Sequence, residues 1–314
     1  MSLIVVAIGG NALRTEDGLG APSEWFDALT QSLPPLVELV AEGHRLVLTH
    51  GNGPQVGEEL LRMEIAKSVM PALTLDLCVA ETEGSIGYAI QQVMGNLLGK
   101  RGLAARVASV VTQVVVDRSD QAFANPTKPI GAFYRKAEAL RHAREHGWSV
   151  VEDSGRGWRR VVPSPRPVRV VETPLIRTLV DAGMIPVAVG GGGIPVFETP
   201  RGFRGAEAVI EKDLATAVLA GELGADRVFF LTGVDRVAVG YGTPAQRFLD
   251  RLTVTEARRL LAAGEFPPGS MGPKVEAAVQ FVEAGGRAAV ITSLDRMAEA
   301  TRGTGGTIIQ RETA

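Results

Sequence analysis

The stretch LIVVAIGGNAL, residues 3 to 13, contains the pattern that decides the fold. Residues 3–8 are a continuous apolar run rich in β-branched side chains, which is typical of a strand buried on both faces. Gly9 and Gly10 follow at once, and glycine lets backbone N–H groups close on an anion with no Cβ in the way. The stretch therefore predicts the first strand of a parallel sheet, with a candidate ligand loop at its carboxyl end.

The same alternation continues along the chain. Short apolar runs that we expect to be strands lie at 45–49, 106–116, 184–189, 227–232 and 287–292. Segments of helical period lie at 54–66, 76–98, 172–182, 212–223 and 273–284. This order predicts an open, mostly parallel sheet covered by helices on both faces. Leu33-Pro34-Pro35 interrupts a further helical stretch and should split it into two pieces.

Residues 118 to 168 break this alternation. They hold two of the three tryptophans and most of the run RRVVPSPRPVRVVE (159–172), with only a short helical piece near 135–146. Long irregular excursions are uncommon unless they are functional or disordered, and the aromatic content argues against disorder. We expect this lid segment, residues 118 to 168, to be a subdomain inserted into a single domain that spans residues 1–314.

Composition limits the classes of partner. With 45% hydrophobic residues the 314-residue chain is an ordinary globular protein. A net charge of −2 gives no broad basic field, so we expect neither nucleic acid nor a membrane surface as a partner. The single cysteine, Cys78, excludes an internal disulfide framework and favours a cytoplasmic location. No apolar run reaches the roughly 18 residues of a membrane-spanning helix.

Two more glycine-rich turns follow predicted strands. They are THGNGPQVG at 49–57 and VGGGGIPV at 189–196. In the first, Pro54 is well placed to begin a helix whose amino terminus faces the same anion as the glycines. Each turn alone could be no more than a tight turn, but three at successive strand ends favour an anion site. None matches the P-loop or Rossmann fingerprints.

Three lysines are presented by stiff or helical backbone. Lys128 stands between Pro126 and Pro129, and Lys274 follows Pro273 in the first turn of a predicted helix. A cation at a helix amino terminus opposes the helix dipole unless an anion binds there. Transfer of a phosphoryl group requires this kind of positioning and charge neutralisation.

The pair Lys212 and Asp213 repeats that arrangement, because it opens a predicted helix that should end near Gly224. The simpler alternative is that Asp213 caps the helix while Lys212 is solvated.

The histidines suggest no catalytic base. His142 and His146 are spaced i, i+4, and we expect them to lie on a solvated helix face and not to bind a metal. His50 adjoins the second glycine loop, where a packed, hydrogen-bonded role is expected. An alcohol acceptor would need a general base, whereas an acceptor that is already an oxyanion needs none.

Taken in order, eight motifs make the chain resemble the carbamate kinase family of the amino-acid kinase superfamily. They are GGNAL (9–13), HGNGPQVG (50–57), EGSIGY (83–88), NPTKPIG (125–131), WRRVVPSP (158–165), GGGGIPV (190–196), EAVIEKDLA (207–215) and GSMGPKVEAA (269–278). The GGN and KD motifs are shared across the superfamily. NPTKPIG with WRRVVPSP belongs more narrowly to carbamate kinases.

The resemblance implies a fold, a reaction and partners. The fold is a three-layer αβα sandwich with an open, mostly parallel sheet, a protruding lid, and a nucleotide-binding lobe at roughly residues 207–314. The reaction is reversible phosphoryl transfer, ATP + carbamate = ADP + carbamoyl phosphate, with Mg²⁺ as cofactor. It further implies a homodimer that makes ATP from carbamoyl phosphate, in arginine metabolism among other routes.

The resemblance also assigns site residues. Lys128 would reach the carbamoyl phosphate from the lid, Lys212 would neutralise the phosphoryl group in flight, and Asp213 would orient Lys212 and Lys274, of which Lys274 also holds the nucleotide phosphates. The amide cradle would comprise Gly9, Gly10, Asn11, Gly51, Asn52, Gly53, Gly191 and Gly192. Adenine is expected near Thr232, Val234, Tyr241 and Met271. The resemblance leaves the metal ligands unknown.

Two departures from the family pattern stand out. The lid motif commonly continues IGPFY, whereas this chain has Ala132 in place of that proline. The run VAVGYGTPAQRF at 237–248 replaces an NFGKP-like run, which puts the adenine contacts in doubt. Two other functions stay open, a sibling kinase of another small carboxylate such as N-acetylglutamate, and a non-catalytic nucleotide-binding regulator.

Overall fold

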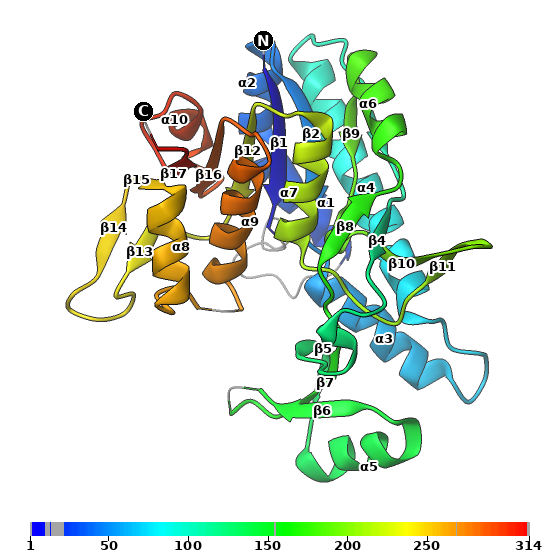
Figure 1. Cartoon of the computed structure of the whole chain (residues 1–314). Helices are drawn as coiled ribbons and strands as arrows, with labels where there is room; N and C mark the ends of the chain where they lie inside the picture. Colours follow the sequence, from blue (N-terminus) through cyan, green and yellow to red (C-terminus); the bar gives the residue numbers. More distant parts are fainter. Residues whose placement is uncertain (1, 10–12, 14–21, 154, 268, 313–314) are drawn as a thin grey trace.

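The computed structural model describes residues 2–9, 13, 22–153, 155–267 and 269–312 (Figure 1). Its centre is an eight-stranded sheet in the order β15-β17-β16-β12-β1-β2-β9-β3. These strands are β15 (Arg251–Thr253), β17 (Thr307–Gln310), β16 (Ala288–Thr292), β12 (Arg227–Leu231), β1 (Leu3–Ile8), β2 (Arg45–His50), β9 (Ile185–Val187) and β3 (Val107–Ser109). From β16 to β3 every neighbouring pair is parallel, and β17 runs antiparallel to β16.

Strand β1 explains why its sequence is apolar throughout. Successive side chains of a strand point to opposite faces, and here both faces are covered. Leu3, Val5 and Ala7 enter one hydrophobic core. The alternate positions Ile4, Val6 and Ile8 enter a second core on the other side of the sheet.

Helices form the outer layers of the sandwich, as Figure 1 shows. Helices α6 (Thr173–Asp181), α7 (Lys212–Leu223), α8 (Val254–Ala262) and α9 (Met271–Glu283) contribute to the first core. The second core receives α1 (Pro22–Ser32), α2 (Pro34–Ala41), α4 (Leu75–Lys100) and α10 (Met297–Thr301). Among the described residues, no helix is at once long and apolar enough to cross a membrane.

Most predicted elements are confirmed. The predicted helix at 212–223 is α7, and Gly224 ends it in the left-handed conformation at φ 64°. The helical stretch around Leu33 is split into α1 and α2, with Pro34 at the start of the second helix. Proline in the first turn costs no hydrogen bond, which explains why the break falls there.

One predicted strand was wrong as a single element. Residues 106–116 form β3 and β4 (Gln113–Val116), which belong to different sheets. The chain leaves the central sheet between them, where the Thr112 N–H donates to the buried Glu83 carboxylate at 2.8 Å. That side-chain acceptor replaces a ladder partner and lets the strand end without an unsatisfied donor.

The second sheet has the order β11-β10-β4-β8. Its other strands are β10 (Ile194–Thr199), β11 (Gly202–Gly205) and β8 (Pro167–Val170). A separate hairpin joins β13 (Val237–Val239) to β14 (Arg247–Leu249). Short 3₁₀ turns η2 (Gln121–Phe123) and η3 (Gly190–Gly192) lie before β5 and between β9 and β10.

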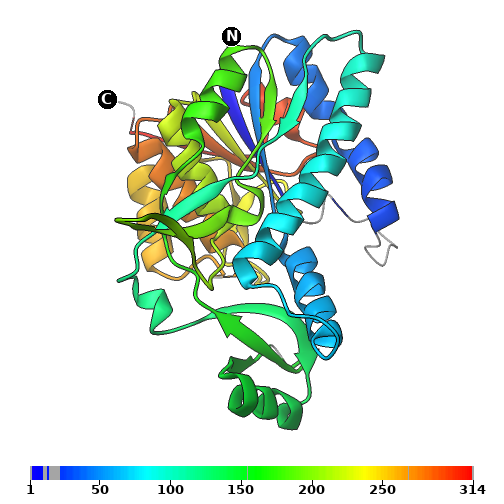
Figure 2. The ribbon, with the colours of Figure 1, turned by 90° about the vertical axis from the view of Figure 1, so that its right-hand side faces the viewer.

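The expected lid segment contains a small sheet of its own. Strands β5 (Lys128–Tyr134), β7 (Trp158–Val162) and β6 (Ser149–Glu152) pair antiparallel in the order β5-β7-β6. Helix α5 (Lys136–His146) packs on it, and this unit protrudes from the sandwich beside α3 (Gly53–Ala66), as Figure 2 shows. Gly57 of α3 and Gly131 of β5 approach so closely that a Cβ on Gly57 would lie 3.3 Å from the Gly131 backbone.

Two glycines of the EGSIGY motif on α4 should respond in opposite ways to alanine. A Cβ on Gly87 would lie 2.0 Å from the Ser109 hydroxyl oxygen, whereas a Cβ on Gly84 would meet nothing within 4 Å. We expect Gly84→Ala to stabilise the fold by up to about 1 kcal/mol and Gly87→Ala to destabilise it by about 1–3 kcal/mol. Urea unfolding of both variants checks this, and equal shifts would contradict the close packing of α4 on β3.

Candidate active site

A cavity lies at the carboxyl ends of β1 and β2, where parallel sheets bind ligands. Its volume is about 210 Å³. It is lined by Gly9, Gly51, Asn52, Gly53, Val56, Lys128, Pro129, Ile130, Gly191, Val209, Ile210, Glu211, Lys212, Asp213 and Lys274. All three glycine loops and all three lysines singled out from the sequence therefore meet at one cavity.

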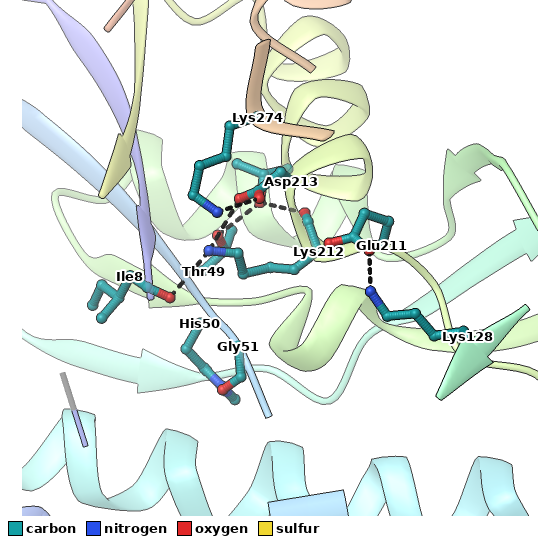
Figure 3. A network of polar contacts seen from close by, with 10 residues as sticks. Ile8, Thr49, His50, Gly51, Lys128, Glu211, Lys212, Asp213 and Lys274 are labelled. Carbon is teal, nitrogen blue, oxygen red and sulfur yellow. Dashed lines mark hydrogen bonds and ion pairs between the residues drawn. The ribbon is translucent and has the colours of Figure 1, made fainter. Parts of the chain in front are cut away.

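Asp213 joins two of the lysines (Figure 3). Its carboxylate accepts a 2.9 Å hydrogen bond from the Lys274 ammonium, and its other oxygen lies 3.0 Å from the Lys212 ammonium. Lys212 also donates to the carbonyl of Ile8, the last residue of β1, at 3.3 Å. One buried carboxylate thus holds two ammonium groups at the end of the central strand.

Opposite charges explain why Lys212 and Asp213 can both be buried. Burial lowers the pKa of the Lys212 ammonium, and the Asp213 carboxylate opposes that shift. Burial alone would raise the pKa of Asp213, but the charges of Lys212 and Lys274 outweigh it and hold the pKa below its ordinary value. Two ammonium groups share one carboxylate, so the cluster has an excess positive charge that faces the cavity.

Lys128 comes to the cavity from the other side. It begins β5, the strand at the base of the lid segment, and its ammonium donates to the Glu211 carboxylate. Glu211 is the residue immediately before Lys212, so the partner of the lid lysine and the core lysine are neighbours in the chain (Figure 3).

Hydrogen bonds through Thr112 hold the start of the third glycine loop. Val189 has φ 54°, a conformation that a β-branched residue adopts only under constraint. Its N–H donates to the Thr112 hydroxyl at 3.0 Å, and Thr112 in turn donates its own N–H to Glu83. Gly191 has φ 66°, and a Cβ there would lie 2.1 Å from the Asn52 amide. The close approach of the second and third loops therefore requires glycine.

His50 is a packed residue, as the sequence indicated. It is buried, and its Nδ1 lies 3.1 Å from the Gly51 carbonyl. Burial lowers its pKa to about 4, with a smaller contribution from the Lys212 charge. The imidazole is therefore neutral at physiological pH and adds no charge to the cavity.

A second cavity of about 380 Å³ adjoins the first. It is lined by Ile8, Gly9, Ser32, Leu231, Thr232, Gly233, Lys274, Ser293, Leu294 and Asp295. Gly9 and Lys274 line both cavities, so the Lys274 ammonium stands at their junction. Several of these residues follow β12 and β16, which end at the same edge of the sheet as β1.

Most of the predicted site residues line one of the two cavities, and some do not. Gly9, Gly51, Asn52, Gly53, Gly191, Lys128, Lys212, Asp213 and Lys274 line the first cavity, and Thr232 lines the second. Gly192 is buried in the third loop and lines neither cavity. Val234, Tyr241 and Met271 are not among the residues that line either cavity, so their contact with adenine stays a prediction. Gly10 and Asn11 lie outside the described residues.

Sequence reasoning missed Glu211 and the residues after β16. Glu211 lies inside the quoted EAVIEKDLA motif, but its pairing with Lys128 spans 83 positions and has no local signal. Ser293 and Asp295 follow a predicted strand directly, so the rule that ligands gather at strand ends could have found them.

The expectation for His142 was wrong. It is buried with 3% of its surface exposed, because it stacks on Trp148 with ring centroids 4.6 Å apart. His146, one turn later on α5, is exposed as expected. A histidine that packs on an aromatic ring covers apolar surface, a role that the i, i+4 spacing does not reveal.

Known proteins resemble this chain over nearly its whole length, in sequence and in fold. The model of the amino acid kinase family matches residues 2–293. A carbamate kinase from Thermococcus kodakarensis is 47% identical over 99% of this chain and 100% of its own length. Carbamate kinase 1 from Enterococcus faecium is 48% identical over 94% of each chain. The structure of a carbamate kinase from Giardia lamblia bound to AMP-PNP has a TM-score of 0.93, with 40% identity and 99% coverage of each chain.

The pKa of His50 predicts a pH dependence of stability. Its pKa falls from 6.5 to about 4 on folding, so the unfolded chain binds a proton near pH 6 that the folded chain does not. The neutral His50 therefore makes its full contribution to the free energy of unfolding above pH 6.5. About 3 kcal/mol of that free energy is lost as the pH falls toward 4. We expect His50→Asn, which keeps a nitrogen near the Nδ1 position without titrating, to flatten the dependence of unfolding free energy on pH between 6.5 and 4.5.

An NMR titration of the imidazole is the direct measurement. A His50 resonance that shifts near pH 6.5 would contradict the buried, neutral side chain.

Proposed function

The chain belongs to the amino acid kinase family and, within it, to the carbamate kinases, and from that premise we propose how its side chains divide the work of phosphoryl transfer. The reaction is ATP + carbamate = ADP + carbamoyl phosphate, so the enzyme is a phosphotransferase whose acceptor is a carboxyl-type oxygen. The observation that carries the proposal is the cluster of buried Lys212 and Asp213 with partly buried Lys274, which lies where two cavities meet.

Each substrate is assigned to one cavity. The larger cavity, with Thr232 at the end of β12, takes the nucleotide, and the cavity between the glycine loops takes carbamate or carbamoyl phosphate. Gly9 and Lys274 line both, so the migrating phosphoryl group crosses between them. The Giardia relative bound to AMP-PNP supports the assignment of a nucleotide site to this fold.

Catalysis then rests on positioning and charge. In phosphoryl transfer the negative charge on the equatorial oxygens must be neutralised without reorganisation of the site. Lys212 faces the phosphoryl group in flight, Lys274 holds the nucleotide phosphates, and Asp213 keeps both ammonium groups oriented. Carbamate and the terminal phosphate of ADP are already anionic, so neither direction of the reaction calls for a general base.

Lys128 adds charge from the lid. In the structure its ammonium is held by Glu211 at the cavity wall, and an arriving phosphate offers it a second anionic partner. Pro126 and Pro129 restrict the backbone on either side, which lowers the entropy cost of placing that charge.

The residues of the site fit Mg²⁺ that arrives with the nucleotide. Both acidic side chains at the first cavity, Asp213 and Glu211, are paired with lysines, so phosphate oxygens and water are left as the main ligands. When bound, the ion would neutralise charge on the phosphate oxygens.

The remaining assignments extend the same proposal. They are a homodimer, a cytoplasmic location, and use of the reaction in arginine metabolism to make ATP from carbamoyl phosphate. The single cysteine, Cys78, is free and buried, which agrees with a reducing compartment.

The two alternative functions are disfavoured by different observations. Relatives named carbamate kinase that align over nearly the whole chain argue against a sibling kinase for another carboxylate. A binding protein without activity would have no need for an intact cluster of Lys212, Asp213 and Lys274 facing Lys128.

Turnover is tested by a coupled assay for ATP formed from ADP and carbamoyl phosphate with Mg²⁺ present. We expect ATP formation and the reverse reaction from ATP and carbamate. Retained ADP binding without turnover would instead support the regulatory alternative.

The role of Lys128 is tested by Lys128→Ala. We expect kcat to fall by about 100-fold to 1,000-fold, since a charge that stabilises the transition state is lost, while the unfolding midpoint stays near that of the wild type. Lys136→Ala is the matched control, because Lys136 belongs to the same lid segment but lies over the Trp158 ring, 5.4 Å from its centroid. Wild-type kinetics in Lys128→Ala would reduce that lysine to a structural role.

The role of Asp213 is tested by Asp213→Asn. The substitution leaves the buried Lys212 ammonium and the partly buried Lys274 ammonium without their shared counter-charge. Both turnover and stability should fall, stability by about 3 kcal/mol. Asp226→Asn serves as the control, since Asp226 is exposed and its carboxylate accepts only from the Leu3 N–H among the hydrogen bonds described. An Asp213→Asn enzyme with unchanged kcat would refute the proposed bridging role.

A further inference from the structure

A cluster of metal-ligating side chains lies away from the active site, where the lid segment meets α3. Glu64 comes from α3, and His142 and His146 come from successive turns of α5. One ligand atom of each residue lies within 4.8 Å of the other two, and no comparable group occurs elsewhere in the described part of the chain. The proposed phosphoryl transfer makes no use of these residues.

His142 supplies an independent sign that a ligand is missing. Its side chain is 4% exposed, and its Nδ1 has no hydrogen-bond partner among the described residues. That nitrogen lies 3.8 Å from the Glu64 carboxylate, too far for a hydrogen bond. A buried ring nitrogen without a partner is costly, and a bound cation would satisfy it.

Lys67 already places a positive charge among these groups. Its ammonium lies 2.5 Å from the same Glu64 oxygen and 3.3 Å from the Nε2 of His146. The site therefore attracts a cation between the carboxylate and the imidazole. The Lys67 side chain is 42% exposed and can turn out to solvent, which would leave its position to a metal ion.

The ligand atoms of Glu64, His142 and His146 could hold a small transition metal ion if they moved slightly closer together. Two imidazole nitrogens and one carboxylate oxygen form a ligand set that Zn²⁺ prefers, at bond lengths that separate tetrahedral ligand atoms by about 3.4 Å. The ligand atoms here lie within 4.8 Å of one another, up to about 1.4 Å farther apart than that, a difference that rotation of the Glu64 and His146 side chains can remove. A cavity of about 230 Å³, lined in part by Glu64, Lys67 and His146, leaves room for water as the fourth ligand.

We propose that Glu64, His142 and His146 form a binding site for a divalent transition metal ion of the Zn²⁺ class, which bridges α3 to the lid segment. Helix α3 begins at Gly53 in the active-site loop, and β5 of the lid segment begins at Lys128. The ion would therefore couple the glycine loop to the segment that carries the lid lysine, and so stabilise one arrangement of the two.

The test uses the full chain without an affinity tag, stripped of metal by a chelator. Zn²⁺ is added during calorimetry, and we expect about one ion to bind per chain. His146→Ala should weaken binding by at least about tenfold, since it removes one of three ligands. It should also abolish the rise in unfolding temperature that Zn²⁺ gives the wild type. His146 is exposed on α5, so this variant keeps the packing of His142 on Trp148.

Two further variants sharpen the test. Lys67→Met removes the competing ammonium and should tighten Zn²⁺ binding by about tenfold, a gain that a merely structural cluster would not produce. His44→Ala is the matched control, because the His44 ring also lies near a glutamate, 3.9 Å from Glu42, but precedes β2 and belongs to neither α3 nor the lid segment. Mg²⁺ at the same concentration should give no stabilisation that depends on His146, since it prefers oxygen ligands.

Amide hydrogen exchange measures whether the metal ion holds α5 of the lid segment against α3. Zn²⁺ should slow exchange of the α5 amides in the wild type and leave His146→Ala unchanged. The proposal is overturned if Zn²⁺ fails to bind at micromolar concentration, if His146→Ala and His44→Ala bind it as well as the wild type, or if Lys67→Met weakens binding.

Discussion

The buried charge of Asp213 is the constraint on which the rest of the site depends. A carboxylate in the interior is stable only when paired, and here two ammonium groups share it. Because one negative charge meets two positive charges, the cluster is left with a surplus that an anionic ligand can neutralise. Structural pairing and ligand attraction therefore come from the same three side chains.

The sheet explains how these side chains reach one place. Strands β12, β1 and β2 are adjacent and parallel, so the loops that follow them emerge at one edge. Helix α7 begins at Lys212 against that edge, and the Lys212 ammonium donates to the carbonyl that ends β1. Two adjoining cavities then share Gly9 and Lys274, which provides a short path for a group that passes from one ligand to another.

The lid segment contacts the rest of the protein near this edge in two places. At its base, Lys128 pairs with Glu211 beside the core lysines. Farther out, α5 approaches α3 through His142, His146 and Glu64. Both contacts join the lid segment to elements that begin at the candidate site, since α3 starts at Gly53 in the second glycine loop and Glu211 immediately precedes Lys212. The close approach of Gly57 to Gly131 adds a backbone contact between α3 and β5.

The amino-acid sequence by itself determined the alternation of strands and helices, the three glycine loops and the lysines with their motif partners. These are local patterns, in which the residues that matter lie within a few positions of each other, as in LIVVAIGG or the Lys212-Asp213 pair. Only the tertiary structure decided that residues 106–116 divide between two sheets, that Glu211 holds Lys128, and that His142 is buried against Trp148. Such pairings depend on which strands become neighbours, and strand order results from packing of the whole chain and leaves no mark on the few residues around each partner.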